Sequence, residues 1–239
     1  MRYICFLLIS LFFAAPVQAQ LGYGPEVGIG MSRMYFAPPI YPIDYTQVST
    51  NAVASGKIGG LIDLPLSKHF YAQAGISFAR EGIVRSFSYD LSDSFNESIH
   101  QTLYLNYIQV PVSIVYKTGV QGKGRVIFGV GANPAYLMGG RNELQDNQVF
   151  KGVANQTSSN TLVVNVLSRF DIGVNLSAGY ELPTGLFFRA YYVDGVNDLS
   201  LNSEIDKNRM WGIAAGYIFG KGRNINKDDE GLIDKTPAQ

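Results

Sequence analysis

The amino-acid sequence predicts an all-β fold, namely an eight-stranded antiparallel up-and-down transmembrane β-barrel. Three observations predict it. Apolar and polar residues alternate over segments of about ten residues, only 16% of the residues are charged, and the connections alternate between short and long. A tilted strand needs about 9–11 residues to cross a bilayer, and soluble domains carry about 25% charged residues.

The N-terminus predicts a secretory signal peptide over residues 1–19. Arg2 precedes an apolar run over residues 4–15, and P-V-Q-A-Q follows. This run is shorter than the ~20 residues that a helix needs to span a bilayer, so we expect cleavage after Ala19 rather than a helical anchor. Cys5, the single cysteine, lies inside this segment. The mature chain is therefore expected to contain no disulfide and no cysteine metal site.

The first four strands are expected at residues 23–32, 55–64, 70–85 and 103–116. Side chains of successive residues point to opposite faces of a strand. In the first segment, Val27, Ile29 and Met31 form an apolar face opposite Glu26 and glycines. The third and fourth segments repeat this alternation, which predicts one face toward lipid and one toward the barrel lumen.

The last four strands are expected at residues 125–138, 170–182, 186–193 and 210–219. Residues 170–182 show the strictest alternation, with an apolar face that begins at Phe170 and ends at Tyr180. Aromatic residues at both ends of a strand are typical of the interfacial girdles of membrane barrels. Pro111 and Pro134 fall inside two expected strands, and proline cannot donate to the ladder, so we expect a bulge at one or both.

The connections predict an asymmetric barrel. Short turns are expected at residues 65–68, 117–124 and 182–185, and long loops at 33–53, 86–102, 139–167 and 195–208. Membrane barrels have short periplasmic turns and longer extracellular loops. The long loops are the expected functional surface, for a partner protein, a glycan or a phage. The barrel domain is expected over residues 20–220, with a polar periplasmic tail over 221–239.

Two neighbouring segments resemble a known family. They are L-N-Y-I-Q-V-P-V-S-I-V-Y-K over residues 105–117 and R-V-I-F-G-V-G-A-N-P-A-Y-L over residues 125–137. The pair is similar to the PorT-like outer-membrane β-barrel family of Bacteroidetes, which often has an acid where this chain has Gln109. The resemblance implies a Gram-negative outer-membrane location and a link to protein secretion across that membrane.

Six charged residues lie on the polar face of the expected strands and are predicted to point into the lumen. They are Glu26, Lys57, Asp63, Asp171, Glu181 and Arg189. An eight-stranded barrel is just wide enough for side chains to fill it, so these charges are expected to pair as structural filling. An ion or proton path is the alternative. Arg189 and Glu26 are expected to pair across the lumen.

The sequence predicts no catalytic, cofactor-binding or metal-binding residues. His69 and His100 are the two histidines, and a metal site needs more ligands than two distant histidines supply. Ser98, His100 and Glu97 could form a hydrolase site in the second long loop, but this local pattern is weak. The 19 basic and 19 acidic residues leave no net charge that would favour nucleic acid.

Four functional interpretations follow. The leading one is a non-enzymatic outer-membrane barrel of structural, adhesive or assembly type, with outer-membrane lipid around it and cell-surface protein partners on its loops. The second, from the resemblance, is an accessory component of an outer-membrane secretion or transport machinery. The third is a lipid-modifying enzyme. The fourth is a soluble lipocalin-like barrel with its apolar face inward, which alternation alone does not distinguish.

Overall fold

A computed structural model describes residues 21–36, 47–92, 95–119, 123–150, 153–162, 168–199 and 206–220. The expected signal peptide and the expected polar tail lie outside the described residues. Within them, the chain forms the following strands: β1 (Gly22–Phe36), β2 (Gln47–Asn51), β3 (Val53–Pro65), β4 (Phe70–Ser92), β5 (Phe95–Gln109), β6 (Val112–Lys117), β7 (Arg125–Phe150), β8 (Val153–Leu162), β9 (Phe170–Glu181), β10 (Leu186–Gly195) and β11 (Asp206–Tyr217).

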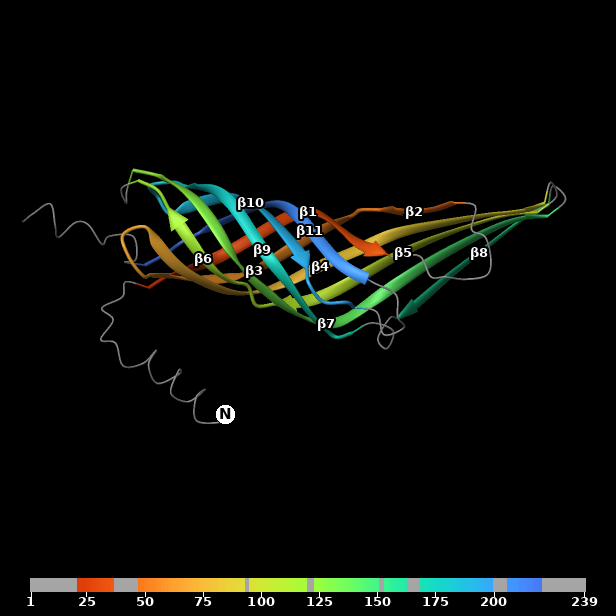
Figure 1. Ribbon diagram of the computed structural model, residues 1–239, viewed down its shortest axis with the longest axis horizontal. Coiled ribbons are helices and arrows are strands. Elements are labelled where there is room, and N and C mark those ends of the chain that lie inside the picture. The colour runs from red at the N-terminus through yellow and green to blue at the C-terminus, as the bar shows by residue number, and fades with distance from the viewer. Residues whose placement is uncertain are drawn as a thin grey trace, which may run out of the picture.

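The strands close into an eight-membered antiparallel ring, which confirms the predicted fold class (Figure 1). The ring runs β1, β3, β4, then β5 with β6, then β7, β9, β10 and β11, and β11 pairs with β1 again. The closing seam extends from Glu26 opposite Gly216 to Phe36 opposite Asp206. Closure leaves the barrel without an edge strand, because every ladder donor there has a partner.

The two prolines have different effects, and neither carries the expected bulge. Pro111 interrupts one ring position, so that β5 ends at Gln109 and β6 begins at Val112. Pro134 stays inside β7 opposite Ile172, whose amide donates to the Asn197 side chain at 2.8 Å. The extra residue is instead Met138, since Asn106 pairs with Gly139 and Tyr107 with Leu137.

A sheet extension projects from one end of the barrel (Figure 1). We use this name for β2, residues 84–92 of β4, 95–103 of β5, 141–150 of β7, and β8, which pair in the order β2, β4, β5, β7, β8. Two segments predicted as long loops, 86–102 and 139–167, are therefore mostly strand. The loop prediction was wrong because the alternation of Phe87, Tyr89 and Leu91 with polar residues continues the preceding strand pattern past residue 85, whereas residues 141–150 and 153–162 are mostly polar and give little period.

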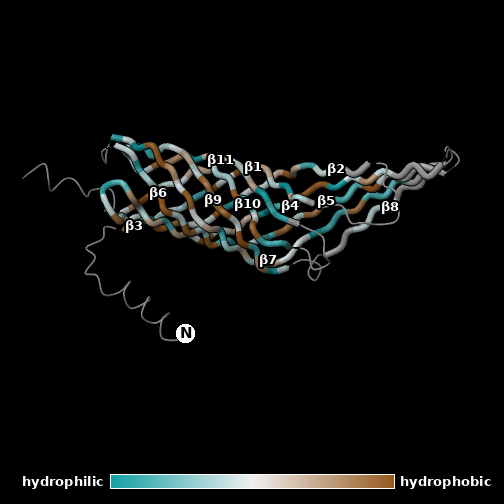
Figure 2. Tube along the Cα trace, in the orientation of Figure 1, coloured by the Kyte–Doolittle hydropathy of each residue, from teal (hydrophilic) through white to brown (hydrophobic). Residues whose placement is uncertain are grey.

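The outward face of the barrel is apolar. Ile29, Ile58 and Ile213 are more than 60% exposed, and Phe128, Phe188 and Tyr23 more than 50%. Figure 2 shows apolar residues recurring along the strands of the barrel. Such exposure would be costly in water and is what a lipid-facing surface requires. No helix in the described part of the chain is long and apolar enough to cross a membrane.

Candidate functional site

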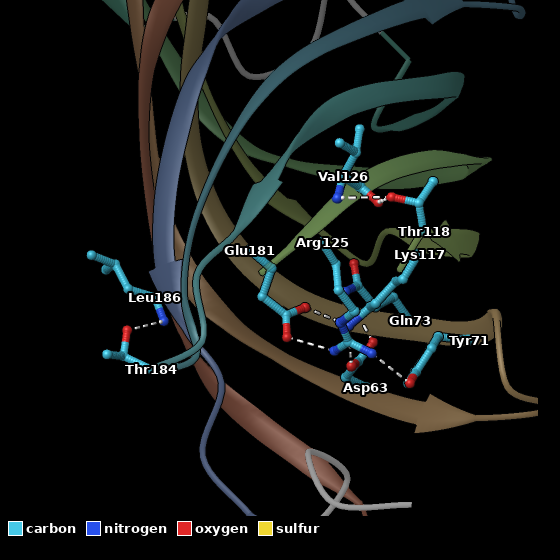
Figure 3. Close-up of polar contacts among 10 residues, drawn as sticks. All are labelled: Asp63, Tyr71, Gln73, Lys117, Thr118, Arg125, Val126, Glu181, Thr184 and Leu186. Carbon is cyan, nitrogen blue, oxygen red and sulfur yellow. Dashed lines mark hydrogen bonds and ion pairs between the residues drawn. The ribbon is translucent and has the colours of Figure 1, made fainter. Parts of the chain in front are cut away.

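The inward face of the barrel is packed with side chains in layers, and the first layer is an ion network at the short-turn end (Figure 3). Lys117 Nζ lies 2.5 Å from Asp63 Oδ2 and 2.9 Å from Glu181 Oε2. Arg125 Nη2 lies 2.5 Å from Glu181 Oε1, and its Nη1 donates to Tyr71 Oη at 2.7 Å. Two cations therefore balance two carboxylates.

The strand ends explain why these residues meet. Lys117 is the last residue of β6, Arg125 the first of β7 and Glu181 the last of β9. These ends lie at one rim because Arg125 pairs directly with Glu181 in the β7–β9 ladder. The Lys117 side chain is 1% exposed, and a buried ammonium of this kind is stable only when it is paired.

The second layer holds Glu26, Lys57 and Arg189. Lys57 Nζ lies 2.7 Å from Glu26 Oε1, and Arg189 forms an ion pair with Glu26 Oε2. The pairing expected between Arg189 and Glu26 is thus present. Arg189 also donates to Gln73 Oε1 at 3.0 Å, and Gln73 donates to Asp63 Oδ1 at 3.1 Å. Gln73 therefore connects the second layer to the first.

The third layer is acidic. Glu81 accepts a hydrogen bond from Gln109 Nε2 at 2.6 Å and another from the Asn208 amide nitrogen. Asp171 lines the same small cavity as Glu81 and Asn208. Neither carboxylate forms an ion pair with a lysine or arginine of the described residues. Amide donors, rather than a cation, satisfy Glu81.

An apolar cluster fills the lumen beyond the third layer. Its members are Met34, Ile83, Leu103, Leu105, Tyr107, Ala135, Leu137 and Leu199. They come from β1, β4, β5, β7 and the connection after β10, so the cluster spans the ring. Water is excluded from a packed apolar layer of this kind.

All six charged residues singled out in the sequence are buried or nearly so, as residues that face the lumen would be. The structure adds Lys117, Arg125 and Glu81, which the sequence analysis did not single out. Lys117 was assigned to the 117–124 turn, and Arg125 was placed at the start of the strand expected over residues 125–138. Glu81 has the same strand parity as Tyr71 and Gln73, and this parity was the signal that could have identified it.

The histidines lie apart. His69 Nδ1 is 3.1 Å from the Lys117 carbonyl oxygen. His100, on the extension, contacts Ser86 Oγ at 2.9 Å and Ser98 Oγ at 3.3 Å. The side chain of Glu97, the third member of the weak hydrolase pattern, lies outside the described residues. The described residues contain no group of three or more His, Cys, Asp or Glu that could hold a metal ion.

A family comparison identifies the barrel. Residues 16–201 match the family model of the outer membrane protein beta-barrel domain. The chain belongs to this family. As a member of the outer membrane protein beta-barrel domain family, it resides in the bacterial outer membrane, and its outward face contacts lipid. No curated protein matches the chain in sequence.

Several solved outer-membrane barrels are similar to this family member. Ail of Yersinia pestis, in complex with the heparin analogue sucrose octasulfate, is 14% identical, with a TM-score of 0.38 and coverage of 84% of this chain and 99% of Ail. Neisserial surface protein A is 8% identical, with a TM-score of 0.39 and coverage of 82% and 97%. The N-terminal barrel of Pseudomonas aeruginosa OprF is 12% identical, with a TM-score of 0.34 and coverage of 84% and 100%.

Proposed function

We propose that this chain is a non-enzymatic outer-membrane barrel of structural, adhesive or assembly type. Its lumen is plugged by side chains, and its function is carried by the sheet extension on the cell surface. The observation that carries this proposal is the continuation of the β4–β5 and β7–β8 hairpins, as paired strands, beyond the barrel. A barrel that served only as a membrane anchor would need no such sheet.

The composition of the extension supports a binding role. Strand β8, V-A-N-Q-T-S-S-N-T-L, contains no charged residue and is rich in side chains that both donate and accept hydrogen bonds. Thr157 and Ser159 of this strand are exposed. Such a surface suits a polar protein or glycan partner, and loops and extensions on a rigid scaffold commonly carry function.

The packed lumen supports the plugged state. Lys117 and Arg125 balance Asp63 and Glu181 at one end, and an apolar cluster closes the other. Eight-stranded barrels have interiors that side chains can fill, whereas aqueous channels occur in barrels of about 16–18 strands. The charged residues of the lumen therefore act as structural filling rather than as an ion path.

Site-specific photo-crosslinking in intact bacteria tests the proposal. A photo-reactive residue replaces Thr157 or Ser159 on β8, and in a matched control it replaces the lipid-facing Ile213. We expect protein or glycan adducts from the two extension positions and lipid adducts alone from the control. Absence of any macromolecular adduct from the extension would remove the basis of the proposal.

A second candidate is an accessory component of an outer-membrane secretion or transport machinery. It is supported by the PorT-like resemblance of residues 105–117 and 125–137, and by β2 and β8, each of which pairs with a single strand among the described residues. An extended segment of a partner can add to such an edge. Co-purification with large membrane partners in mild detergent would favour this candidate. Isolation of the barrel with surface ligands alone would favour the first.

A further inference from the structure

Three basic residues, Arg33, Arg209 and Lys207, are neighbours in the register of the β1–β11 seam, on the parity of its outward apolar residues. Arg33 of β1 is directly opposite Arg209 of β11, and Tyr35 is opposite Lys207. Arg33 is exposed, and the Arg209 side chain is 46% exposed. Like charges directly opposite each other destabilise a ladder unless an anion lies between them.

The described contacts do not neutralise this group. Arg209 Nε lies 2.8 Å from Asp194 Oδ1, and Arg33 Nη2 donates to Thr50 Oγ1 at 2.8 Å. Among the described side-chain contacts, one carboxylate therefore faces three cations, which leaves a net charge of about +2. Each guanidinium retains N–H donors beyond these single contacts, and its planar fork suits a phosphate.

The height of the group on the barrel places it at the lipid headgroups. Tyr23 begins the outward apolar series of β1, and Arg33 follows ten residues later, after Met31. Ten residues rise about 33 Å along a strand. At the usual tilt of about 40° this is about 25 Å along the membrane normal, which is the height of the apolar band of such barrels.

An apolar groove lies below the basic group on the same strands. It is lined on β1 by Val27 and Ile29, on β10 by Phe188, and on β11 by Ile213 and Ala215. Ile29 is opposite Ile213, and Arg33 and Arg209 lie four residues farther along their strands. The groove and the basic group are therefore continuous, with Met31 and Trp211 between them.

We propose that Arg33, Arg209 and Lys207 bind the phosphate group of a membrane lipid whose acyl chain lies in this groove. The two arginines hold the phosphate between them, which removes their mutual repulsion. The lipid bridges β1 and β11 and so stabilises the seam that closes the barrel. The site differs from the surface of the extension, so failure of one proposal leaves the other standing.

The experiment uses the full chain, folded in detergent, with native mass spectrometry to count retained lipids. The probes are bisphosphorylated lipid A and its enzymatically dephosphorylated form. The variant is Arg33→Gln with Arg209→Gln, and the matched control is Arg141→Gln, an exposed arginine already paired with Glu143 at 3.2 Å.

Each basic residue near an anionic surface contributes a factor of about five to binding, so we expect about thirty-fold weaker retention in the double variant. The control should bind as the wild type does.

Three results would overturn the proposal. The first is equal retention of lipid A by the double variant, and the second is equal retention of the dephosphorylated lipid by the wild type. The third is complete displacement of lipid A by millimolar inorganic phosphate, which would indicate a site for the free anion. If the double variant does not fold, comparison of the two lipids on the wild type decides the question.

Discussion

Lys117 is a buried charge that is expected to contribute strongly to the stability of the barrel. Its ammonium contacts Asp63 and Glu181, and Lys117→Met would leave these carboxylates with Arg125 as the remaining cation. Breaking a buried ion pair by removing one partner costs about 3–5 kcal/mol. We expect Lys117→Met to lower the free energy of unfolding by about that amount, measured by urea titration in detergent. Arg141→Gln, on the exposed surface, should change it by less than about 0.5 kcal/mol.

Glu81 is expected to behave in the opposite way. Its carboxylate is 2% exposed and is held by Gln109 and Asn208 rather than by a cation. Replacing a buried, uncompensated charge by a neutral group of the same shape removes a desolvation cost. We expect Glu81→Gln to raise the free energy of unfolding by about 1 kcal/mol, seen as a higher temperature in a heat-shift gel. A lower temperature would show that the hydrogen bonds accepted by both carboxylate oxygens, from Gln109 and Asn208, are worth more than the cost of burying the charge.

The polar residues of the lumen were predictable where a strand alternates cleanly, as at Glu26, Asp171 and Arg189. Lys117 and Arg125 were not, because Lys117 was assigned to the 117–124 turn and Arg125 follows it directly, and a charge at a turn normally points to water. Only the ring geometry, which sets Arg125 opposite Glu181, shows that they point inward. The layer to which each charge belongs depends on register between strands, which a single sequence does not specify.

At the scale of the element, the closing seam depends on glycine. A Cβ placed on Gly30 of β1 would overlap the Trp211 carbonyl oxygen of β11, whereas a Cβ on Gly139 of β7 would meet nothing within 4 Å. We expect Gly30→Ala to open the seam and reduce the folded yield several-fold, and Gly139→Ala to fold normally. The fraction of heat-modifiable protein after refolding measures both. Equal yields would mean that the strands can separate at the seam to admit a methyl group.

The strands of the barrel were predictable, and those of the extension were not. Lipid on one side and a lumen on the other impose alternation on residues 170–182, so their period identifies a strand. In the extension no lipid imposes this period: residues 141–150 and 153–162 are mostly polar although they pair as strands, and the alternation of Phe87, Tyr89 and Leu91 was not recognised as a continuation of the preceding strand. The bulge expected at Pro111 or Pro134 was wrong, because the register continues past both, and the extra residue lies at Met138, a position that no local sequence signal marks.

For the whole molecule, the proposed packing of the lumen predicts a barrel that does not conduct ions. The charged layers and the apolar cluster around Leu105 and Leu137 lie along the interior, and the proposed plugged state requires that they leave no continuous aqueous path. We expect refolded protein in a planar bilayer to produce no stable conductance steps, with an open porin as the positive reference. Reproducible steps of one size would contradict the plugged lumen and support the ion path instead.

The eight-strand count and the closed ring followed from the sequence because each segment repeats the same pattern and an even number brings β11 back to β1. The identity of any surface partner did not, since the extension is mostly polar and carries no diagnostic motif. The alternation of apolar and polar residues thus predicts the membrane location and the barrel, whereas the choice of a binding partner depends on individual side chains.

Met138 is one extra residue in β7, and it changes which residues, odd-numbered or even-numbered, face inward on either side of it. Below it, odd-numbered residues such as Leu137 face inward, and above it the even-numbered Gly140 does. Deleting Met138 would remove the bulge and leave both halves of β7 in their present register, because Leu137, Gly139 and Gly140 would then alternate regularly opposite Tyr107, Asn106 and Leu105. A cysteine introduced as Asn142→Cys should therefore keep its labelling rate when Met138 is deleted, and a changed rate would show that the extra residue sets the face of this strand. One surplus residue thus alters the parity of β7 without altering which side chains its far end presents.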